Sequence, residues 1–337
     1  MQTRILGSSG LEVSAIGLGC MGFSHAYGAP TEKNEAIRQI QNAVDMGYTF
    51  FDTAECYVGK FADGAVSNNE ALIGEALKPY GSRIIIATKF GVRLQSGTIG
   101  RPVSDSRPEI IRSSVEGSLK RLGRECIDLY YQHRVDPDIS AEEVAGVMSA
   151  LIKEGKIAHW GVSEASEAYI RRAHAVCPLT AIQNRYSMMA RHHETLFPTL
   201  EELNIGYVAF SPIANGFLTG KYDANSTFEP GNDYRTVMPQ FSAEGVEKNG
   251  ELLTLLNRIA ESKSATPAQI SLAWMLCKKP WIVPIPGSRK AERMKENAGA
   301  ANITLTANEV QSLDDALDTM PMSEVFGGIK GERYVRQ

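Results

Sequence analysis

Four side chains whose types together suit proton and hydride chemistry stand near the ends of apolar segments. Asp52, Lys89 and His133 each come at or directly after such a segment, and Tyr57 follows Asp52 by five residues. A lysine ammonium lowers the pKa of a neighbouring phenol, and a carboxylate keeps that lysine charged and in place. A neutral histidine can hydrogen-bond a carbonyl oxygen. The set therefore predicts reduction of a carbonyl group, with the tyrosine as proton donor and a cofactor as hydride donor, because no side chain supplies hydride.

Each of these residues taken alone has a simpler structural explanation. An aspartate after a strand often caps a turn, a lysine there is often only solvated, and a lone histidine is more often structural than catalytic. Their joint placement is the informative feature. Neighbouring strands lie about 4.8 Å apart, so side chains at the ends of successive parallel strands converge on one place. We therefore expect Asp52, Tyr57, Lys89 and His133 to form one catalytic group.

The elements that must position these residues alternate between strand and helix along the chain. Apolar and β-branched runs predict eight strands, at residues 15–20, 48–52, 83–88, 127–132, 157–161, 180–183, 206–210 and 281–284. Amphipathic or capped segments predict eight helices, at residues 32–46, 68–78, 108–122, 141–154, 167–176, 195–203, 266–277 and 291–300. This alternation favours a closed parallel (β/α)8 TIM barrel over an open sheet. We expect one such domain over residues 1–337.

Segments beyond the eight units have identifiable positions. Two short runs, 4–7 and 11–14, flank a turn and predict an N-terminal β-hairpin that could close the bottom of the barrel. The long polar segment 222–250 follows the seventh strand, so it belongs to the face where barrels bind ligands. Two extra helices are expected at 252–262 and 307–317, and residues 320–337 are expected to form a loose tail.

Composition excludes several classes of function. Lys plus Arg total 35 and Asp plus Glu total 39, so the net charge is −4. This balance lacks the excess of positive charge that is typical of proteins that bind nucleic acid or an anionic membrane. No apolar run reaches the length of a spanning helix, and residues 1–10 lack the features of a signal peptide. Five scattered cysteines and no His/Cys/Asp cluster predict free thiols, no metal site and a cytoplasmic protein. A G-x-G-x-x-G match at 17–22 lacks the Rossmann context, and we reject it.

The sequence resembles the aldo-keto reductase superfamily along nearly its whole length, most of all the branch that includes perakine reductase and auxin-induced-like proteins. The resemblance rests on GLGCMG (17–22), FDTAECY (51–57), ATKF (87–90), LYYQHR (129–134), WGVSEAS (160–166), QNRYS (183–187), FSPIANGFLTGK (210–221) and IPGSRKAERMKEN (285–297). It implies a barrel with NADPH extended across the strand ends and a catalytic tetrad of Asp52, Tyr57, Lys89 and His133.

The resemblance also implies a set of residues that bind the cofactor, NADPH or NADP+. Glu164 stands where the family usually has Asn, so it can accept from the carboxamide but cannot donate. Phe210 replaces a ring-stacking tyrosine, and Gly287 replaces a frequent lysine, with Arg289 close by. Arg293 matches the residue for the 2′-phosphate, which predicts NADPH over NADH. The full set comprises Met21, Gly22, Asp52, Ser163, Glu164, Gln183, Phe210, Ser211, Pro212, Ile213, Gly216, Leu218, Lys221, Gly287, Ser288, Arg289, Arg293, Glu296 and Asn297.

The substrate is expected to be a small carbonyl compound without strong charge, since the candidate walls of its pocket are apolar and aromatic. These candidates are Phe23, His25, Tyr27, Val58, Phe61, Phe90, Val92 and the segment 222–250. An alternative is a cofactor-binding regulatory or docking subunit like the potassium-channel β subunits, which the intact tetrad does not exclude. A metal-dependent barrel hydrolase lacks ligands. Whether the chain is a monomer or a homo-oligomer stays open.

Overall fold

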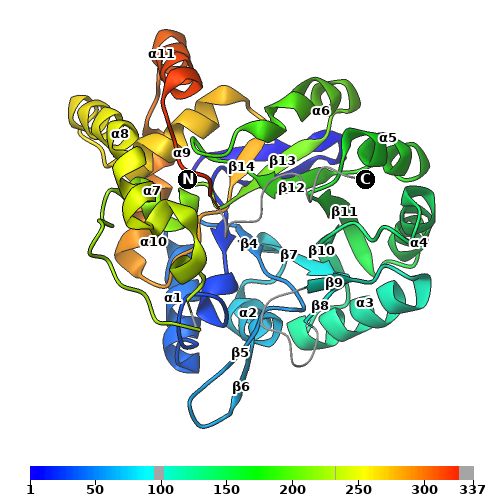
Figure 1. Cartoon of the computed structure of the whole chain (residues 1–337). Coiled ribbons are helices and arrows are strands. Elements are labelled where there is room, and N and C mark those ends of the chain that lie inside the picture. Colours follow the sequence, from blue (N-terminus) through cyan, green and yellow to red (C-terminus); the bar gives the residue numbers. More distant parts are fainter. Residues whose placement is uncertain (95–101, 232, 326–337) are drawn as a thin grey trace.

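Eight parallel strands form one curled sheet around a central axis (Figure 1). The computed structural model describes residues 1–94, 102–231 and 233–325. The strands lie in the order β14-β13-β12-β11-β10-β7-β4-β3. Their bounds are β3 Leu18–Gly19, β4 Phe50–Asp52, β7 Ile85–Phe90, β10 Ile127–Gln132, β11 Ile157–Ser163, β12 Ala181–Arg185, β13 Gly206–Phe210 and β14 Ile282–Pro284. Each predicted strand has its counterpart here, so the TIM-barrel prediction is confirmed.

The barrel closes between its first and last strands, where the glycines of the GLG run are needed. Gly17 donates its N–H to Pro284 O at 2.9 Å, and Gly19 forms a parallel bridge with Gly287. A Cβ on Gly19 would lie 2.8 Å from Ile285 O. Side chains on this edge would therefore push the two strands apart, which gives Gly17 and Gly19 a structural role at the seam.

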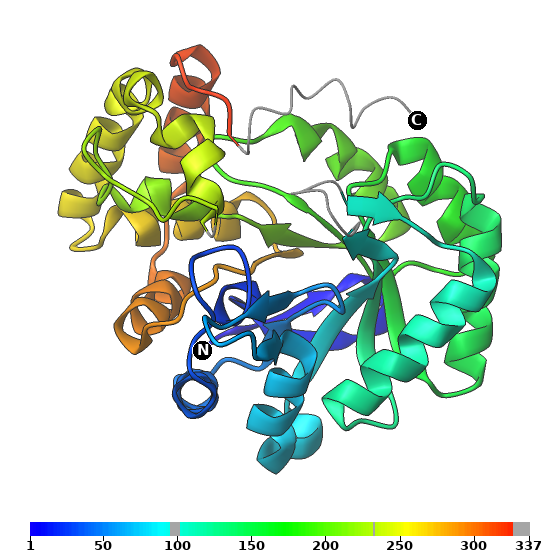
Figure 2. The ribbon, with the colours of Figure 1, turned by 60° about the horizontal axis from the view of Figure 1, so that its bottom comes forward.

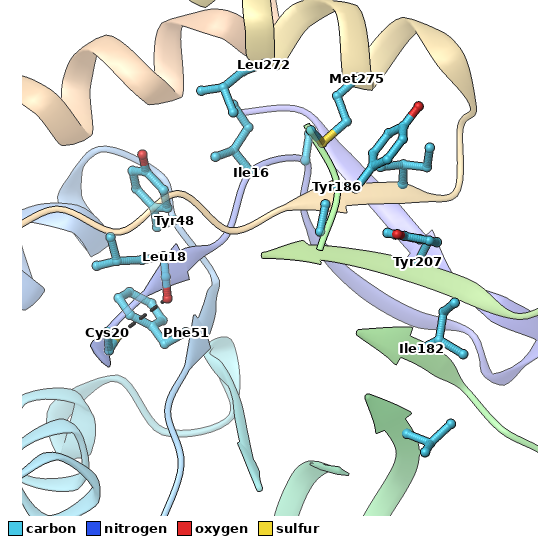
Figure 3. Packing of buried hydrophobic residues seen from close by; sticks show 14 of the residues in the cluster. Ile16, Leu18, Cys20, Tyr48, Phe51, Ile182, Tyr186, Tyr207, Leu272 and Met275 are labelled. Atoms are coloured by element: carbon cyan, nitrogen blue, oxygen red, sulfur yellow. Dashed lines mark hydrogen bonds between the residues drawn. The ribbon is translucent and has the colours of Figure 1, made fainter. Parts of the chain in front are cut away.

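Helices surround the strands and bury the outward-facing side chains against them (Figure 3). In the close-up, Leu18 and Phe51 come from strands, whereas Leu272 and Met275 come from a covering helix. Thr266 caps that helix with a reciprocal capping box and Pro267 is its first residue. The helices are α1 Lys33–Asp45, α2 Asn69–Leu77, α3 Pro108–Leu122, α4 Ala141–Lys153, α5 Glu167–Val176, α6 Phe197–Leu203, α7 Ala243–Lys248, α8 Gly250–Ser262, α9 Pro267–Lys278, α10 Ala291–Gly299 and α11 Ala307–Thr319.

A second, smaller apolar cluster fills the inside of the barrel. The predicted N-terminal hairpin is present as β1 Thr3–Leu6 and β2 Leu11–Ser14. Its buried side chains pack with inward-facing strand residues in a cluster that comprises Leu6, Leu11, Val13, Phe50, Ala87, Leu129, Tyr131, Ala181, Val208, Val283 and Ile285. The hairpin therefore closes the end of the barrel at which the strands begin, as predicted, and leaves the other end for polar side chains.

The structure differs from the sequence-based prediction mainly outside the barrel. The third strand continues through Lys89 to Phe90 instead of ending before the lysine. Two hairpins, β5 Val58–Lys60 with β6 Val66–Asn68 and β8 Val92–Leu94 with β9 Pro102–Ser104, follow barrel strands and were not predicted. Their strands are only three residues long, too short for a visible alternation of polar and apolar residues.

The segment 222–250 is less irregular than expected, because it contains helix α7. Helices α7 and α8 lie beside α9 and α11 on one side of the barrel (Figures 1 and 2). The start of the supposed tail is also ordered, since Ser323 exchanges two hydrogen bonds with Asn249 at 2.8 and 2.9 Å. Residues 326–337 of that tail lie outside the described residues. Within the part of the chain that the structure describes, no helix is both long and apolar enough to cross a bilayer.

Candidate active site

Polar side chains form the top layer of the barrel interior, two residues beyond the apolar layer. Successive side chains on a strand alternate between its two faces, so residue i+2 shares the inward direction of residue i. Phe50, Ala87, Tyr131, Ala181 and Val208 fill the interior. Two positions further along these five segments stand Asp52, Lys89, His133, Gln183 and Phe210, and Ser163 stands at the corresponding end of β11. The period of the strand therefore brings six predicted residues to one end of the barrel.

Lys89 is the centre of this layer and is 0% exposed. Its Nζ donates to Asp52 Oδ1 at 2.5 Å, to Thr53 O at 2.7 Å and to Tyr57 Oη at 3.4 Å. Three acceptors satisfy the three protons of a buried ammonium. The ammonium group thus joins the carboxylate to the phenol, and the structure brings these three predicted residues together with His133.

The pKa of Tyr57 differs from the sequence-based expectation. Burial raises this pKa well above its usual value. The nearby carboxylate of Asp52 and the thiol of Cys56 raise it further. The net shift is therefore upward, so any lowering of this pKa by the Lys89 ammonium, 3.4 Å from the Tyr57 hydroxyl, is outweighed while the site is in this state. Burial likewise raises the pKa of Asp52 itself, against the opposing effects of Lys89 and Gln183. In this state Tyr57 is a protonated phenol at neutral pH.

His133 lies at the end of β10 with its ring edge against the Tyr57 ring, at a centroid distance of 5.8 Å and an angle of 84°. Its backbone N–H donates to Phe90 O at 3.0 Å, which holds it beside β7. Burial lowers the pKa of His133 well below its usual value, and the charges of Arg134 and Lys89 lower it further. The imidazole is therefore neutral at physiological pH, and one of its nitrogens carries a proton that can be donated.

Gln183 and Ser163 lie beside this group and have partners that sequence reasoning did not predict. Gln183 Nε2 donates to Asp52 Oδ2 at 2.7 Å. Ser163 Oγ accepts from Arg134 Nη1 at 3.1 Å, and the same guanidinium donates to His133 O at 2.6 Å. Arg134 was missed as a site residue, although its position directly after His133 was a signal. Ser163 and Gln183 are paired across β11 and β12. The Ser163 hydroxyl can donate a hydrogen bond, and the Gln183 amide oxygen beside it can accept one.

Glu164 has hydrogen-bond partners on β12 that sequence reasoning did not predict. Its backbone has a left-handed φ of 56°, and Asn184 Oδ1 accepts its N–H at 2.7 Å. Its Oε1 accepts from Arg185 N at 2.8 Å and lies 3.5 Å from His193 Nε2. Burial alone would raise the pKa of Glu164, but His193, Arg134 and the Arg185 N–H outweigh it and lower this pKa to about 2. One carboxylate oxygen is therefore engaged with the backbone of β12, and the expected role of Glu164 at a carboxamide stays a prediction.

Replacement of Glu164 by Gln is expected to reduce stability in a pH-dependent way. A carboxyl whose pKa falls on folding from 4.5 to about 2 stabilises the fold above pH 4.5, and this contribution is lost as the pH falls toward 2. Urea unfolding should therefore show Glu164→Gln to be less stable than wild type at pH 7, with the difference shrinking below pH 4.5. Glu247→Gln, at an exposed position of α7, is the matched control. A difference that does not change with pH would contradict the assignment.

Phe210 ends β13 between two guanidinium groups. The Cζ atoms of Arg134 and Arg185 lie 5.9 and 5.7 Å from its ring centroid. The segment that follows has unusual backbone, with φ of 51° at Ser211 and 98° at Gly216. The neighbouring predicted residues are Pro212, Ile213 and Leu218. Leu218 is 0% exposed and packs in the outer core. Its role at the cofactor stays a prediction.

A surface groove of about 720 Å3 lies at the other end of the predicted cofactor region. Three predicted residues, Lys221, Arg293 and Glu296, line it, together with Thr219, Thr266, Pro267, Gln269, Glu292, Lys295 and Gly299. Arg293 Nη1 donates to Glu296 Oε2 at 2.6 Å. Lys295 is a further cation that sequence reasoning missed, although its spacing from Arg293 was visible.

The remaining predicted cofactor residues do not line that groove. Arg289 instead donates to Tyr27 O at 2.8 Å and Ala29 O at 3.0 Å, so it holds the loop after β3. Met21 and Gly22 lie in the short helical turn that begins this loop. Ser288 Oγ accepts from Lys290 N at 3.1 Å. Gly287, as described, forms the seam with β3, and Asn297 is buried in α10.

The opening above Tyr57 is bordered by aromatic side chains from two loops. The His25 ring stacks near Tyr57 at 6.4 Å, and His25 Nε2 lies 3.0 Å from Tyr234 Oη. Tyr234 belongs to the segment 222–250, which therefore reaches the ligand-binding face as predicted. Phe23 and Phe90 do not border this opening, since both pack in the outer core with 1% and 0% exposure. Their place on the outward face of a loop and a strand explains the correction.

The sequence profile of the Aldo/keto reductase family matches residues 15–318, which span the barrel and its top layer. The chain is also 40% identical over 325 residues to Probable aldo-keto reductase 1 of Glycine max, with 96% of this chain and 90% of that protein covered. The chain therefore belongs to the aldo/keto reductase family. Members of this family are oxidoreductases that act on small carbonyl compounds with a nicotinamide cofactor.

Two solved structures show the same architecture. A glycerol dehydrogenase from Gluconobacter oxydans superimposes with a TM-score of 0.83 at 28% identity, covering 96% of this chain and 98% of that chain. An aldo-keto reductase from Bacillus halodurans, in its holo form, gives a TM-score of 0.75 at 26% identity, covering 97% and 99%. Both likenesses extend over nearly the whole chain, including the segments that carry the candidate site.

Proposed function

We propose that this protein is an NADPH-dependent reductase that converts aldehydes or ketones to alcohols, with Tyr57 as the proton donor. The observation that supports it most is the contact of one buried ammonium, Lys89, with both Asp52 and the Tyr57 hydroxyl. A neutral His133 lies beside the same phenol. A proton donor and a hydrogen-bond donor thus stand side by side at the open end of the barrel.

The residues at the site fit a nicotinamide dinucleotide phosphate. Ser163 offers a hydroxyl proton and Gln183 an amide oxygen, which complement the two ends of a carboxamide. Phe210 offers an aromatic face for a planar ring. The cations Lys221, Arg293 and Lys295 line the groove at the far end, where a phosphate ester would gain charge-assisted hydrogen bonds. When bound, the cofactor supplies the hydride that no side chain can supply.

The chain's own residues perform the proton transfer and the orientation of the substrate. His133 donates a hydrogen bond to the carbonyl oxygen and holds it near Tyr57. The Tyr57 Oη–H gives its proton to this oxygen as negative charge develops there. Lys89, at 3.4 Å from Oη, stabilises the resulting phenolate, and Asp52 keeps the ammonium charged and in position.

The function is tested by following NADPH consumption with a panel of aldehydes, ketones and quinones. We expect turnover with uncharged, largely apolar members, because aromatic side chains border the opening. Product analysis should show one alcohol formed for each NADPH consumed. NADPH binding without turnover on any member would contradict the proposal and would favour a regulatory cofactor-binding role.

The preference for NADPH is expected to depend on Arg293. Loss of a charge-assisted hydrogen bond costs about 1.5–3 kcal/mol, so Arg293→Ala should weaken NADPH binding by about tenfold or more. Binding of NADH, which lacks the 2′-phosphate, should change little. Titration of both cofactors by protein fluorescence measures these constants, and Arg258→Ala, on the exposed face of α8, is the control. Equal loss for NADPH and NADH would assign Arg293 a different role.

A further inference from the structure

The thiol of Cys56 lies against the ring of His133, in a contact to which the mechanism above gives no role. Its Sγ is 3.5 Å from His133 Nδ1, within hydrogen-bonding distance for sulfur. Cys56 directly precedes Tyr57 in the loop after β4, whereas His133 follows β10. The contact therefore links two loops that carry two different members of the catalytic group.

We propose that Cys56 is a positioning residue that donates its thiol proton to Nδ1 of His133 and so holds the imidazole with its own proton on Nε2. This inference rests on the proposed function, because it concerns how His133 presents a donor to a carbonyl oxygen. A neutral imidazole has one protonated and one unprotonated nitrogen. A donor that occupies Nδ1 therefore assigns the ring proton to Nε2.

The protonation of both groups supports this direction of the hydrogen bond. Burial raises the pKa of Cys56 to about 12, in spite of the nearby charge of Lys89, so the thiol keeps its proton at neutral pH. Burial lowers the pKa of His133 well below its usual value, so its ring is neutral. The reverse hydrogen bond, from Nδ1–H to sulfur, is less favourable. It would rely on a thiol sulfur, which is a weak acceptor, and it would leave the thiol proton without an acceptor on the imidazole.

The surroundings of His133 leave Nε2 for the substrate. No residue in the ranges 1–94, 102–231 and 233–325 forms a hydrogen bond with Nε2, and His133 keeps 9% of its surface exposed. The edge-to-face contact with Tyr57 orients the plane of the ring but does not distinguish its two nitrogens. The opposite tautomer would direct the lone pair of Nε2 at the lone pairs of a carbonyl oxygen. The hydrogen bond from Cys56 therefore determines whether Nε2 of His133 donates to the carbonyl oxygen or repels it.

The tautomer can be measured directly in the full-length chain labelled with 15N-histidine. Two-bond nitrogen–proton correlation spectra distinguish the Nε2–H form from the Nδ1–H form, and the His133→Gln variant assigns the His133 signals. We expect wild type and Cys56→Ser to show the Nε2–H pattern, since serine keeps a donor. Cys56→Ala should show a mixture of tautomers. The Nδ1–H pattern in wild type, or an unchanged Nε2–H pattern in Cys56→Ala, would overturn the proposal.

Kinetics give a second readout with a matched control. Loss of one hydrogen bond that acts on an orienting group should lower kcat by about three- to tenfold in Cys56→Ala, with KM for NADPH unchanged. Cys56→Ser should recover most of this loss. Cys126→Ala removes a half-buried thiol at the opposite end of β10, where its Sγ donates to Ile127 O at 3.7 Å, and should leave kcat unchanged. Equal kcat in Cys56→Ala and wild type would count against the proposal. Absence of turnover in wild type would instead refute the proposed function, and the spectra alone would then test the tautomer.

Discussion

Tyr57→Phe should lower kcat by about 10²–10⁴-fold while NADPH binding stays close to that of wild type. Removal of the hydroxyl removes the only proton donor that the mechanism uses, and general acid catalysis contributes a factor of this size. The phenyl ring keeps the contacts of Tyr57 with His133 and His25, so the shape of the site should persist. Stopped-flow or steady-state measurement of NADPH oxidation, with the best carbonyl substrate of the panel, gives the effect.

Tyr80→Phe is the matched control for this prediction. Tyr80 lies in the short helical segment before β7, at the end of the barrel opposite the candidate site. It should keep wild-type turnover. Full activity in Tyr57→Phe would remove Tyr57 from the mechanism. A parallel loss of NADPH binding would instead mean that the hydroxyl holds the site together and is not specifically the proton donor.

Lys89→Met should lower the free energy of unfolding by about 3–5 kcal/mol at pH 7, as well as abolish turnover. Removing one partner of a buried ion pair leaves the other as an uncompensated buried charge. Asp52 is 3% exposed, and besides Lys89 its side chain has the amide of Gln183 as a hydrogen-bond partner. Urea unfolding measures the loss. Lys153→Met, at an exposed position near the end of α4, should have little effect.

The loss in Lys89→Met should depend on pH, with a sign set by Asp52. Burial already raises the pKa of this carboxyl, and loss of the ammonium raises it further. A group whose folded-state pKa is raised favours the folded state at low pH, and this advantage disappears as the pH rises through that pKa. The variant should therefore lie closer to wild type in stability at pH 5 than at pH 7. The double variant Asp52→Asn/Lys89→Met should recover part of the loss at pH 7. A loss independent of pH, with no recovery, would show that the charge of Asp52 is not its cause.

The barrel could be predicted from the sequence because each of its strands and helices is indicated by residues that are close together in the chain. An unbroken apolar run such as 83–88 indicates a buried strand, and the capping pair of Thr266 and Pro267 indicates the start of a helix. The eight units follow from repetition of such signals. The short hairpins β5–β6 and β8–β9 were not visible, because three-residue strands carry too few residues for a period to be read.

The partners of the site residues could not be predicted in this way. The sequence by itself determined which residues reach the open end of the barrel, because the period of two along each strand directs Asp52, Lys89 and Gln183 inward. Only the tertiary structure decided what each of them contacts. Gln183 meets a carboxylate 131 positions away, Cys56 meets His133 across 77 positions, and Glu164 accepts a hydrogen bond from the backbone of β12. Such contacts depend on how strands distant in the chain are placed side by side and on the rotamers that packing permits, and a local pattern of residue types contains neither.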